Sequence, residues 1–136
     1  MSKSNALETA DLTYWFTTGA PGVSRPTAWF AALHTSDPGE AAAATEVDAT
    51  VDDTAYARQS VAFTVAGNVA SNSAQITFPA VIYGTGAAPY TVTHFSIWDA
   101  SSGGTLLRYG ALGSPKELSA LEQLSFDAGD ITLTED

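Results

Sequence analysis

Hydrophobic and polar side chains alternate at period two most clearly in the stretch 90–112. Thr93, Phe95 and Ile97 share one parity there, and a second alternating run ends the stretch after the turn-forming cluster DASSGG at 99–104. Successive side chains of a strand point to opposite faces, and glycines readily enter the positive-φ conformations of tight turns. The pattern predicts a β-hairpin at the centre of the fold, with Phe95 and Ile97 on its inward face.

Further strands are predicted on both sides of this hairpin. Residues 27–35 (TAWFAALHT) are apolar on both faces, which is typical of a central strand. Residues 58–65 alternate as one half-buried strand that ends at the turn Gly67-Asn68, and a short strand is expected around Ile76. Loops are predicted at 79–89 and a chain break at 113–115, where Gly and Pro gather.

The segment LSALEQLSF at 118–126 allows two interpretations. Leu118, Leu121 and Leu124 have a spacing that a helical turn would bring together, and the alternative is a pair of short strands. We take the strand interpretation, with strands on both sides of 127–130, because Phe126 and the run 131–133 flank a break at Ala-Gly.

One helix is predicted, over about residues 5–18. Asn5 is the expected N-cap, with Glu8 in the capping-box position three residues later. Two interpretations remain open: the helix packs on its own domain, or it docks on a neighbouring subunit. Its apolar stripe consists of Leu7, Ala10 and Tyr14, widened by Trp15 and Phe16.

Together these elements predict a mainly β protein. Six to eight short strands at roughly 8–15-residue spacing, with one N-terminal helix, are typical of an antiparallel β-sandwich or barrel-like domain. A length of 136 residues fits a single domain over 1–136.

The long loop at about 36–55 is acidic. Asp37 lies in its opening turn, and five more carboxylates follow: Glu40, Glu46, Asp48, Asp52 and Asp53. Their spacing does not follow the calcium loop of EF-hands, so no metal site is predicted. We expect a mobile or partner-bound loop of mutually repelling charges, in which neutralising Asp52 and Asp53 leaves the fold unharmed.

The charge balance changes the range of possible partners. A net charge of −10 disfavours a nucleic-acid backbone and an anionic membrane surface. The sequence has no cysteine, no recognisable secretion signal and no apolar run of membrane-spanning length. These features favour a protein made in a cytoplasm.

The residues favour no catalytic chemistry and no cofactor. The two histidines, His34 and His94, both lie within strand patterns, and no nucleophile elbow or phosphate-binding glycine loop is present. Trp15, Trp29 and Trp98 could form a carbohydrate platform, although large aromatics in a small β-domain usually belong to its core. An enzyme is therefore not expected.

An ordered set of motifs spans about residues 4–134. SNALETADLTYWF, TAWFAALHTSDPGE, YARQSVAFT, SNSAQITFPA, VTHFSIWDASSGGTLLRYGAL and DAGDITLT resemble small virion proteins of tailed bacteriophages, of the tail-fibre-like and capsid-decoration type. The resemblance implies a non-enzymatic structural protein of a virion, synthesised in the host cytoplasm.

Two functions compete within that class. The compact chain without a stem or shaft repeat favours a capsid decoration or cement protein, while the family's usual label favours a tail fibre or other tail component. A carbohydrate-binding module is the third alternative.

The resemblance also predicts an oligomer, expected to be a trimer, and contacts with other virion proteins such as the major capsid or tail proteins. Loops and termini usually carry recognition. The candidate contact residues are Leu7, Tyr14, Trp15, Asp37, Glu40, Glu46, Asp48, Asp52, Asp53 and Tyr83.

Overall fold

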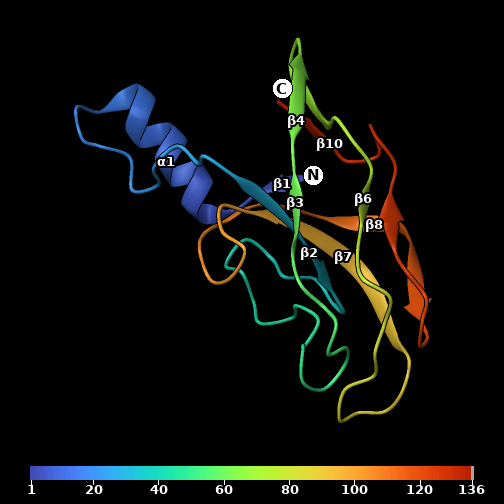
Figure 1. The fold of residues 1–136 in the computed structure, drawn as a ribbon. Coiled ribbons are helices and arrows are strands. Elements are labelled where there is room, and N and C mark those ends of the chain that lie inside the picture. The colour runs from blue at the N-terminus through green and yellow to red at the C-terminus, as the bar shows by residue number, and fades with distance from the viewer. Residues whose placement is uncertain (136) are drawn as a thin grey trace.

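A five-stranded antiparallel sheet, in the order β1-β8-β7-β2-β3, forms the centre of the fold (Figure 1). The computed structural model describes residues 1–135. The strands of this sheet are β1 (Ser2–Lys3), β2 (Trp29–His34), β3 (Gln59–Val61), β7 (Tyr90–Trp98) and β8 (Leu106–Leu118). β2 lies between β7 and β3, which confirms the prediction of a central strand there.

Two smaller sheets complete the mainly β architecture. One is three-stranded, in the order β10-β5-β4, and the other pairs β6 with β9. Within residues 1–135 the three sheets are separately hydrogen-bonded and do not close into a barrel, so the mainly β prediction is confirmed and the arrangement fits its sandwich form. Their strands are β4 (Phe63–Ala66), β5 (Val69–Asn72), β6 (Ile76–Thr77), β9 (Ser125–Phe126) and β10 (Thr132–Thr134).

One hydrophobic core joins the three sheets. Leu33 and Ile97 of the central sheet and Ile131 beside β10 are at most 1% exposed. Phe78 and Phe126 add an edge-to-face aromatic pair with ring centroids 6.5 Å apart, next to the pairing of β6 with β9. Burying such large apolar side chains supplies the main driving force for this arrangement.

The predicted hairpin is confirmed, but the predicted chain break at 113–115 is wrong. β8 continues to Leu118, and its register against β7 changes from Ala111 opposite His94 to Lys116 opposite Val92. The extra residues form a bulge, where a proline is tolerated because no ladder hydrogen bond is needed from it.

The same irregularity changes which residues of β7 face the core. Tyr90 and Val92 are buried in the core before the bulge and Ile97 after it, although their positions differ in parity. Phe95, expected on the inward face, is only partly buried and packs against the margin of the core. Ser96 is fully buried on the opposite face of the strand, which is therefore covered as well.

The single strand predicted over 58–65 is two strands in different sheets. β3 ends at Val61 and β4 begins at Phe63, so the chain passes between layers at Ala62. The predicted turn at Gly67-Asn68 is confirmed, with Gly67 at a φ of +62°, and it leads into β5, which the sequence pattern did not indicate. The strand interpretation of the segment around 127–130 is also confirmed by β9 and β10.

The helix α1 (Asn5–Phe16) lies against β8 at its N-terminal end and projects from the sheets at its C-terminal end (Figure 1). Its N-cap is Ser4, not Asn5: the Ser4 hydroxyl accepts the Leu7 N–H at 3.2 Å and donates to the Leu106 carbonyl at 2.5 Å. Ala10 is buried, and Leu7 packs against the core. This part of the predicted stripe is confirmed.

Candidate interaction surfaces

The C-terminal half of α1 exposes a patch of large apolar side chains, here called the aromatic tip. Leu12, Tyr14, Trp15 and Phe16 are 61%, 64%, 73% and 80% exposed. Leu12 shares a helix face with Trp15 and Phe16 by i, i+3 and i, i+4 spacing, and Tyr14 packs edge-to-face on Trp15 at 5.1 Å. Of the two interpretations of the helix, packing on its own domain holds for Leu7 and Ala10. It does not hold for Tyr14, because the helix leaves the sheet after Ala10.

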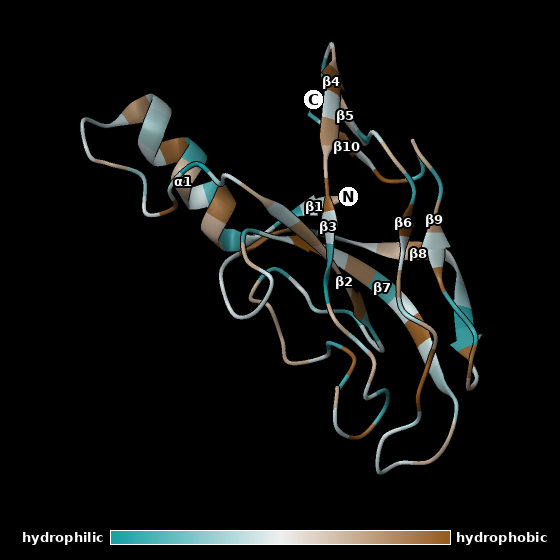
Figure 2. Cartoon of the chain, viewed as in Figure 1, coloured by the Kyte–Doolittle hydropathy of each residue, from teal (hydrophilic) through white to brown (hydrophobic). Residues whose placement is uncertain are grey.

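An apolar groove runs beside the base of this helix. It is a cavity of about 340 Å³ between α1, the segment 23–26 and the three-stranded sheet. Phe63, Val65 and Leu133 line it from the sheet, and Figure 2 shows hydrophobic residues both in α1 and in β4. Arg25 and Arg108 are the charged residues among those that line it. The sequence pattern did not indicate the groove, because its walls come from segments far apart in the chain.

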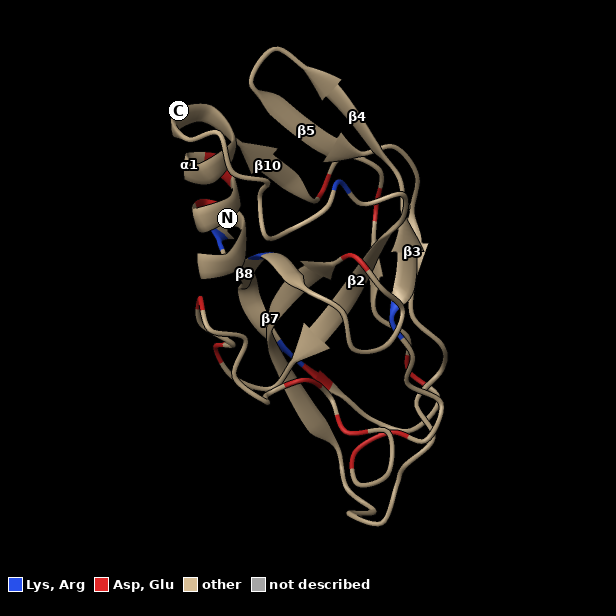
Figure 3. Cartoon of the chain, turned by 90° about the vertical axis from the view of Figure 1, so that its left-hand side faces the viewer, with Lys and Arg blue, Asp and Glu red and all other residues tan. Residues whose placement is uncertain are grey.

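Acidic residues gather on the loops below β2 and β7 in the view of Figure 3. The prediction of mutually repelling charges there is wrong for Asp53, which is 2% exposed. Asp53 Oδ1 accepts the N–H groups of Ala55 and Ile82, each at 2.9 Å, and Oδ2 accepts the Tyr90 hydroxyl at 3.0 Å. The carboxylate therefore holds the acidic loop to β7 and to the loop 79–89.

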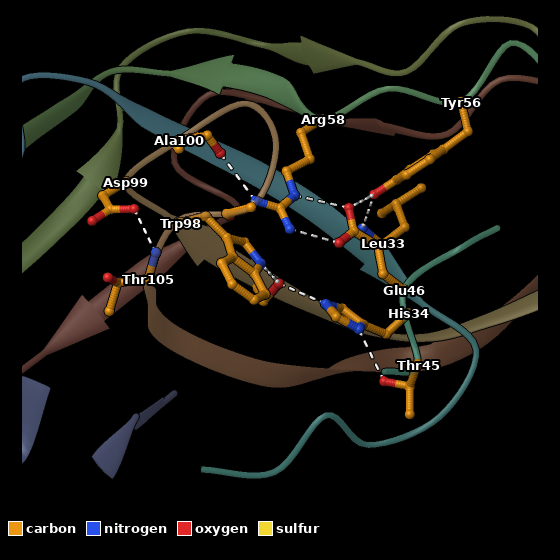
Figure 4. A network of polar contacts seen from close by, with 12 residues as sticks. Leu33, His34, Thr45, Glu46, Tyr56, Arg58, Trp98, Asp99, Ala100 and Thr105 are labelled. Atoms are coloured by element: carbon orange, nitrogen blue, oxygen red, sulfur yellow. Dashed lines mark hydrogen bonds and ion pairs between the residues drawn. The ribbon is translucent and has the colours of Figure 1, made fainter. Parts of the chain in front are cut away.

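Glu46 is the second acidic residue that the fold itself uses. Its carboxylate receives a two-pronged ion pair from Arg58, with N–O distances of 2.9 and 2.7 Å, and the Tyr56 hydroxyl at 2.8 Å (Figure 4). Burial alone would raise the pKa of Glu46, but the hydrogen bonds from Arg58 and Tyr56 outweigh it and hold the pKa below its ordinary value.

Arg58 ties this ion pair to the turn of the central hairpin. Its guanidinium donates to the carbonyl oxygens of Ala100 and Gly103 and lies 4.0 Å above the ring of Trp98 (Figure 4). Such a cation–π contact with a planar guanidinium is stabilising when partly shielded from water. Arg58 was not singled out from the sequence, although it is one of only five basic residues in an acidic chain.

His34 lies beside Ser96 on the face of the central sheet opposite Leu33 and Ile97. Its two ring nitrogens lie 2.6 Å from Ser96 Oγ and 3.0 Å from Thr45 Oγ1, and Ser96 Oγ also accepts the Trp98 indole N–H at 2.7 Å (Figure 4). Burial lowers the pKa of His34 to about 4. His34 and Ser96 are at most 1% exposed, so the pair serves as a structural bridge between β2 and β7, closed to substrates from solvent.

The remaining candidate contact residues differ in their surroundings. Asp37 and Glu40 are exposed, and Asp48 is exposed while it accepts the N–H groups of Thr50 and Val51 in a local turn. Asp52 is half-buried and accepts the N–H of Asp48 at 3.0 Å. Tyr83 packs against the core and forms a β-bridge with Asp53. Of the ten candidates, the fold thus brings Asp48, Asp52, Asp53 and Tyr83 together in one corner and leaves Tyr14 and Trp15 elsewhere.

The described part of the chain has neither a cluster of metal-binding side chains nor a membrane-spanning helix. Residues 1–135 hold no group of three or more His, Asp or Glu side chains arranged to bind a metal ion. Over the same residues, no helix combines the length and the apolar character needed to cross a bilayer.

Comparison with known protein families identifies a match. A family model described as podophage GP4 fiber I protein gp80 matches residues 2–134, nearly the whole chain. No curated protein matches the sequence. The match confirms the resemblance to small virion proteins of tailed phages. The chain therefore belongs to the family of podophage GP4 fiber I protein gp80 and is a structural protein of a phage virion.

Proposed function

We propose that this protein is a non-enzymatic component of a phage tail fibre. The observation that carries the proposal is the family match over residues 2–134, whose description names a fibre protein. It supports the tail-fibre alternative of the sequence interpretation over capsid decoration. The buried polar side chains of residues 1–135 all have hydrogen-bond partners, which suits a structural part that must keep its shape.

The aromatic tip is the surface we propose for attachment. A buried aromatic side chain covers about 150–250 Å², so three that are mostly exposed offer roughly 400 Å². At about 25 cal/mol per Å², burying them contributes on the order of 10 kcal/mol. Association costs roughly 4–15 kcal/mol, so the tip needs a complementary surface on its partner to hold stably.

The location within the virion tests the proposal directly. Purified virions would be imaged by cryo-electron microscopy with the protein labelled, and its copy number measured by quantitative mass spectrometry. We expect label on the tail and a copy number that is a small multiple of three or six. Label in hundreds of copies over the head would overturn the fibre proposal and support capsid decoration.

A variant series links the tip to attachment. The double substitution Trp15→Ser and Phe16→Ser should lower incorporation into virions at least tenfold. Leu121→Ser is the control, since Leu121 is equally exposed but lies in the turn after β8, where its N–H donates to the Val81 carbonyl. Equal incorporation of both variants would show that attachment uses another surface.

A further inference from the structure

We propose that the aromatic tip of one copy docks in the apolar groove of a second copy, so that copies join head to tail. The inference rests on the proposed role of the tip as an attachment surface and names its partner. The two surfaces lie on the same chain, and the structure leaves both open.

The geometry prevents the tip from filling the groove of its own chain. Leu7 and Ala10 of α1 form part of the groove wall, and the tip begins two residues beyond Ala10 on the same rigid helix. With a rise of 1.5 Å per residue, Phe16 lies about 9 Å further along the helix axis. The tip therefore points out of the domain, as Figure 1 shows for α1, and is available only to another molecule.

The groove has the size and lining that suit such a partner. Its volume of about 340 Å³ lies at the lower end of the range of small-molecule sites, room for bulky side chains but not for a whole helix. Val65 lines the groove and is 74% exposed, so its side chain is open to a partner. Insertion of the Trp15 and Phe16 rings would bury both apolar surfaces at once.

The charges favour a second copy as the occupant. At a net charge of −10, two copies repel each other unless they meet through surfaces without carboxylates. The sequence carries no acidic residue between Asp11 and Asp37, so the tip meets this condition. The last turn of α1 also has no basic residue to balance the partial negative charge of the helix C-terminus.

The groove carries the complementary charge. Two of the five basic residues of the chain, Arg25 and Arg108, line it. Arg108 pairs with Glu135, whereas Arg25 is exposed and makes no ion pair with any of residues 1–135. Arg25 can thus meet the incoming helix C-terminus and the face of an aromatic ring.

A contact between two different patches is heterologous, and such contacts form a closed ring when the rotation between copies closes. The tip supplies roughly half of the ~800 Å² that each partner buries in a standard interface, so the contact extends beyond the tip to neighbouring residues of the same copy. The trimer expected from the sequence is one such ring.

A complementation experiment in solution separates this arrangement from others. The full chain, a tip variant (Trp15→Glu) and a groove variant (Val65→Glu) would be compared by analytical ultracentrifugation, with melting temperatures as a check on folding. Both side chains are mostly exposed, so both variants should fold. We expect the full chain to associate, and each variant alone to associate at least tenfold more weakly.

The mixture of the two variants gives the decisive result. A 1:1 mixture retains one intact tip and one intact groove, so it should form a dimer and nothing larger. If Val65→Glu leaves association unchanged, or if the mixture stays monomeric while the full chain associates, the tip-to-groove contact is wrong. A full chain that is monomeric at all concentrations would also overturn it.

Cross-linking provides a second measurement that does not depend on weakened binding. The chain has no cysteine, so Leu12→Cys on one copy, which keeps the Trp15 and Phe16 rings, and Val65→Cys on another place thiols only on the two sides of the proposed contact. Each variant oxidised alone measures the background of homodisulfides. Oxidation of their mixture should give a covalent dimer, and the control pair Leu121→Cys with Val65→Cys should not. If the copies associate through this contact but the label in virions lies on the heads, only the fibre proposal is contradicted. If the label lies on the tails but the copies do not associate through this contact, only the docking of the tip in the groove is contradicted.

Discussion

Removing the Asp53 carboxylate should destabilise the fold, although this residue lies in a loop where the sequence suggested free surface charge. In the variant Asp53→Ala, the N–H groups of Ala55 and Ile82 and the hydroxyl of Tyr90 lose their acceptor. Each buried donor left without a partner costs about 1–3 kcal/mol, and Asp53 is 2% exposed, so water cannot easily replace the carboxylate.

The expected loss is about 3–5 kcal/mol for Asp53→Ala, a large part of the roughly 5–15 kcal/mol that stabilises a typical domain. Asp53→Asn should cost less, about 1–2 kcal/mol, because its carbonyl oxygen can still accept both N–H groups and only the partner of Tyr90 changes. Asp53→Asn is expected to lose less stability than Asp53→Ala because one carboxylate oxygen accepts both N–H groups, and the other accepts only the Tyr90 hydroxyl.

Urea unfolding followed by circular dichroism measures both losses, and thermal unfolding should show a drop of about 10–20 °C for Asp53→Ala. Glu40→Gln is the matched control, because Glu40 is exposed in the same loop and its side chain makes no hydrogen bond with residues 1–135. If Asp53→Ala unfolds within a degree or two of this control, the anchoring role of Asp53 is refuted.

Three further outcomes follow from the structure. Ile97→Ala should lose about 2–5 kcal/mol in urea unfolding, since Ile97 is fully buried between the sheets, and a loss below 1 kcal/mol would contradict its placement. Gly84→Ala should lower the melting temperature because its new Cβ would lie 2.3 Å from the Thr50 carbonyl oxygen, whereas Gly113→Ala, with open space around it, should not; equal melting temperatures would disprove this close approach. The free energy of unfolding should fall by about 3 kcal/mol as pH drops from 6.5 to 4. His34 of the unfolded chain binds a proton near its ordinary pKa of 6.5, whereas His34 of the folded chain binds one only near its lowered pKa of about 4. His34→Gln should flatten that part of a pH series of unfolding free energies, and an unchanged slope would assign it to other groups.

The aromatic tip shows how far local pattern reaches. The sequence alone placed a helix over nearly its observed residues, because apolar spacing and the Gly and Pro after it are local signals. It could not tell that Ala10 is the last buried position and that Trp15 and Phe16 face solvent. That division depends on how far β8 extends beneath the helix, which is a matter of tertiary packing.

The acidic loop shows the same limit for charged groups. Composition correctly located a segment without regular strands, but a carboxylate is buried or solvated according to the donors that distant segments bring to it. Asp53 meets Ile82 and Tyr90, 29 and 37 residues away, and Glu46 meets Arg58 across the end of β2. No spacing within the loop carries that information.

The sequence by itself determined the mainly β class, the central strand, the hairpin, the single helix and, through its ordered motifs, the phage virion family. These features follow from period-two alternation, from turn-forming residues and from sequence motifs that occur in order along the chain. Only the tertiary structure decided the exchange of sheets at Ala62, the bulge that carries β8 past Pro115 and the groove between α1 and the three-stranded sheet. Each of these depends on long-range packing between segments that are remote in sequence, where the burial of apolar surface outweighs the local preference of any one residue.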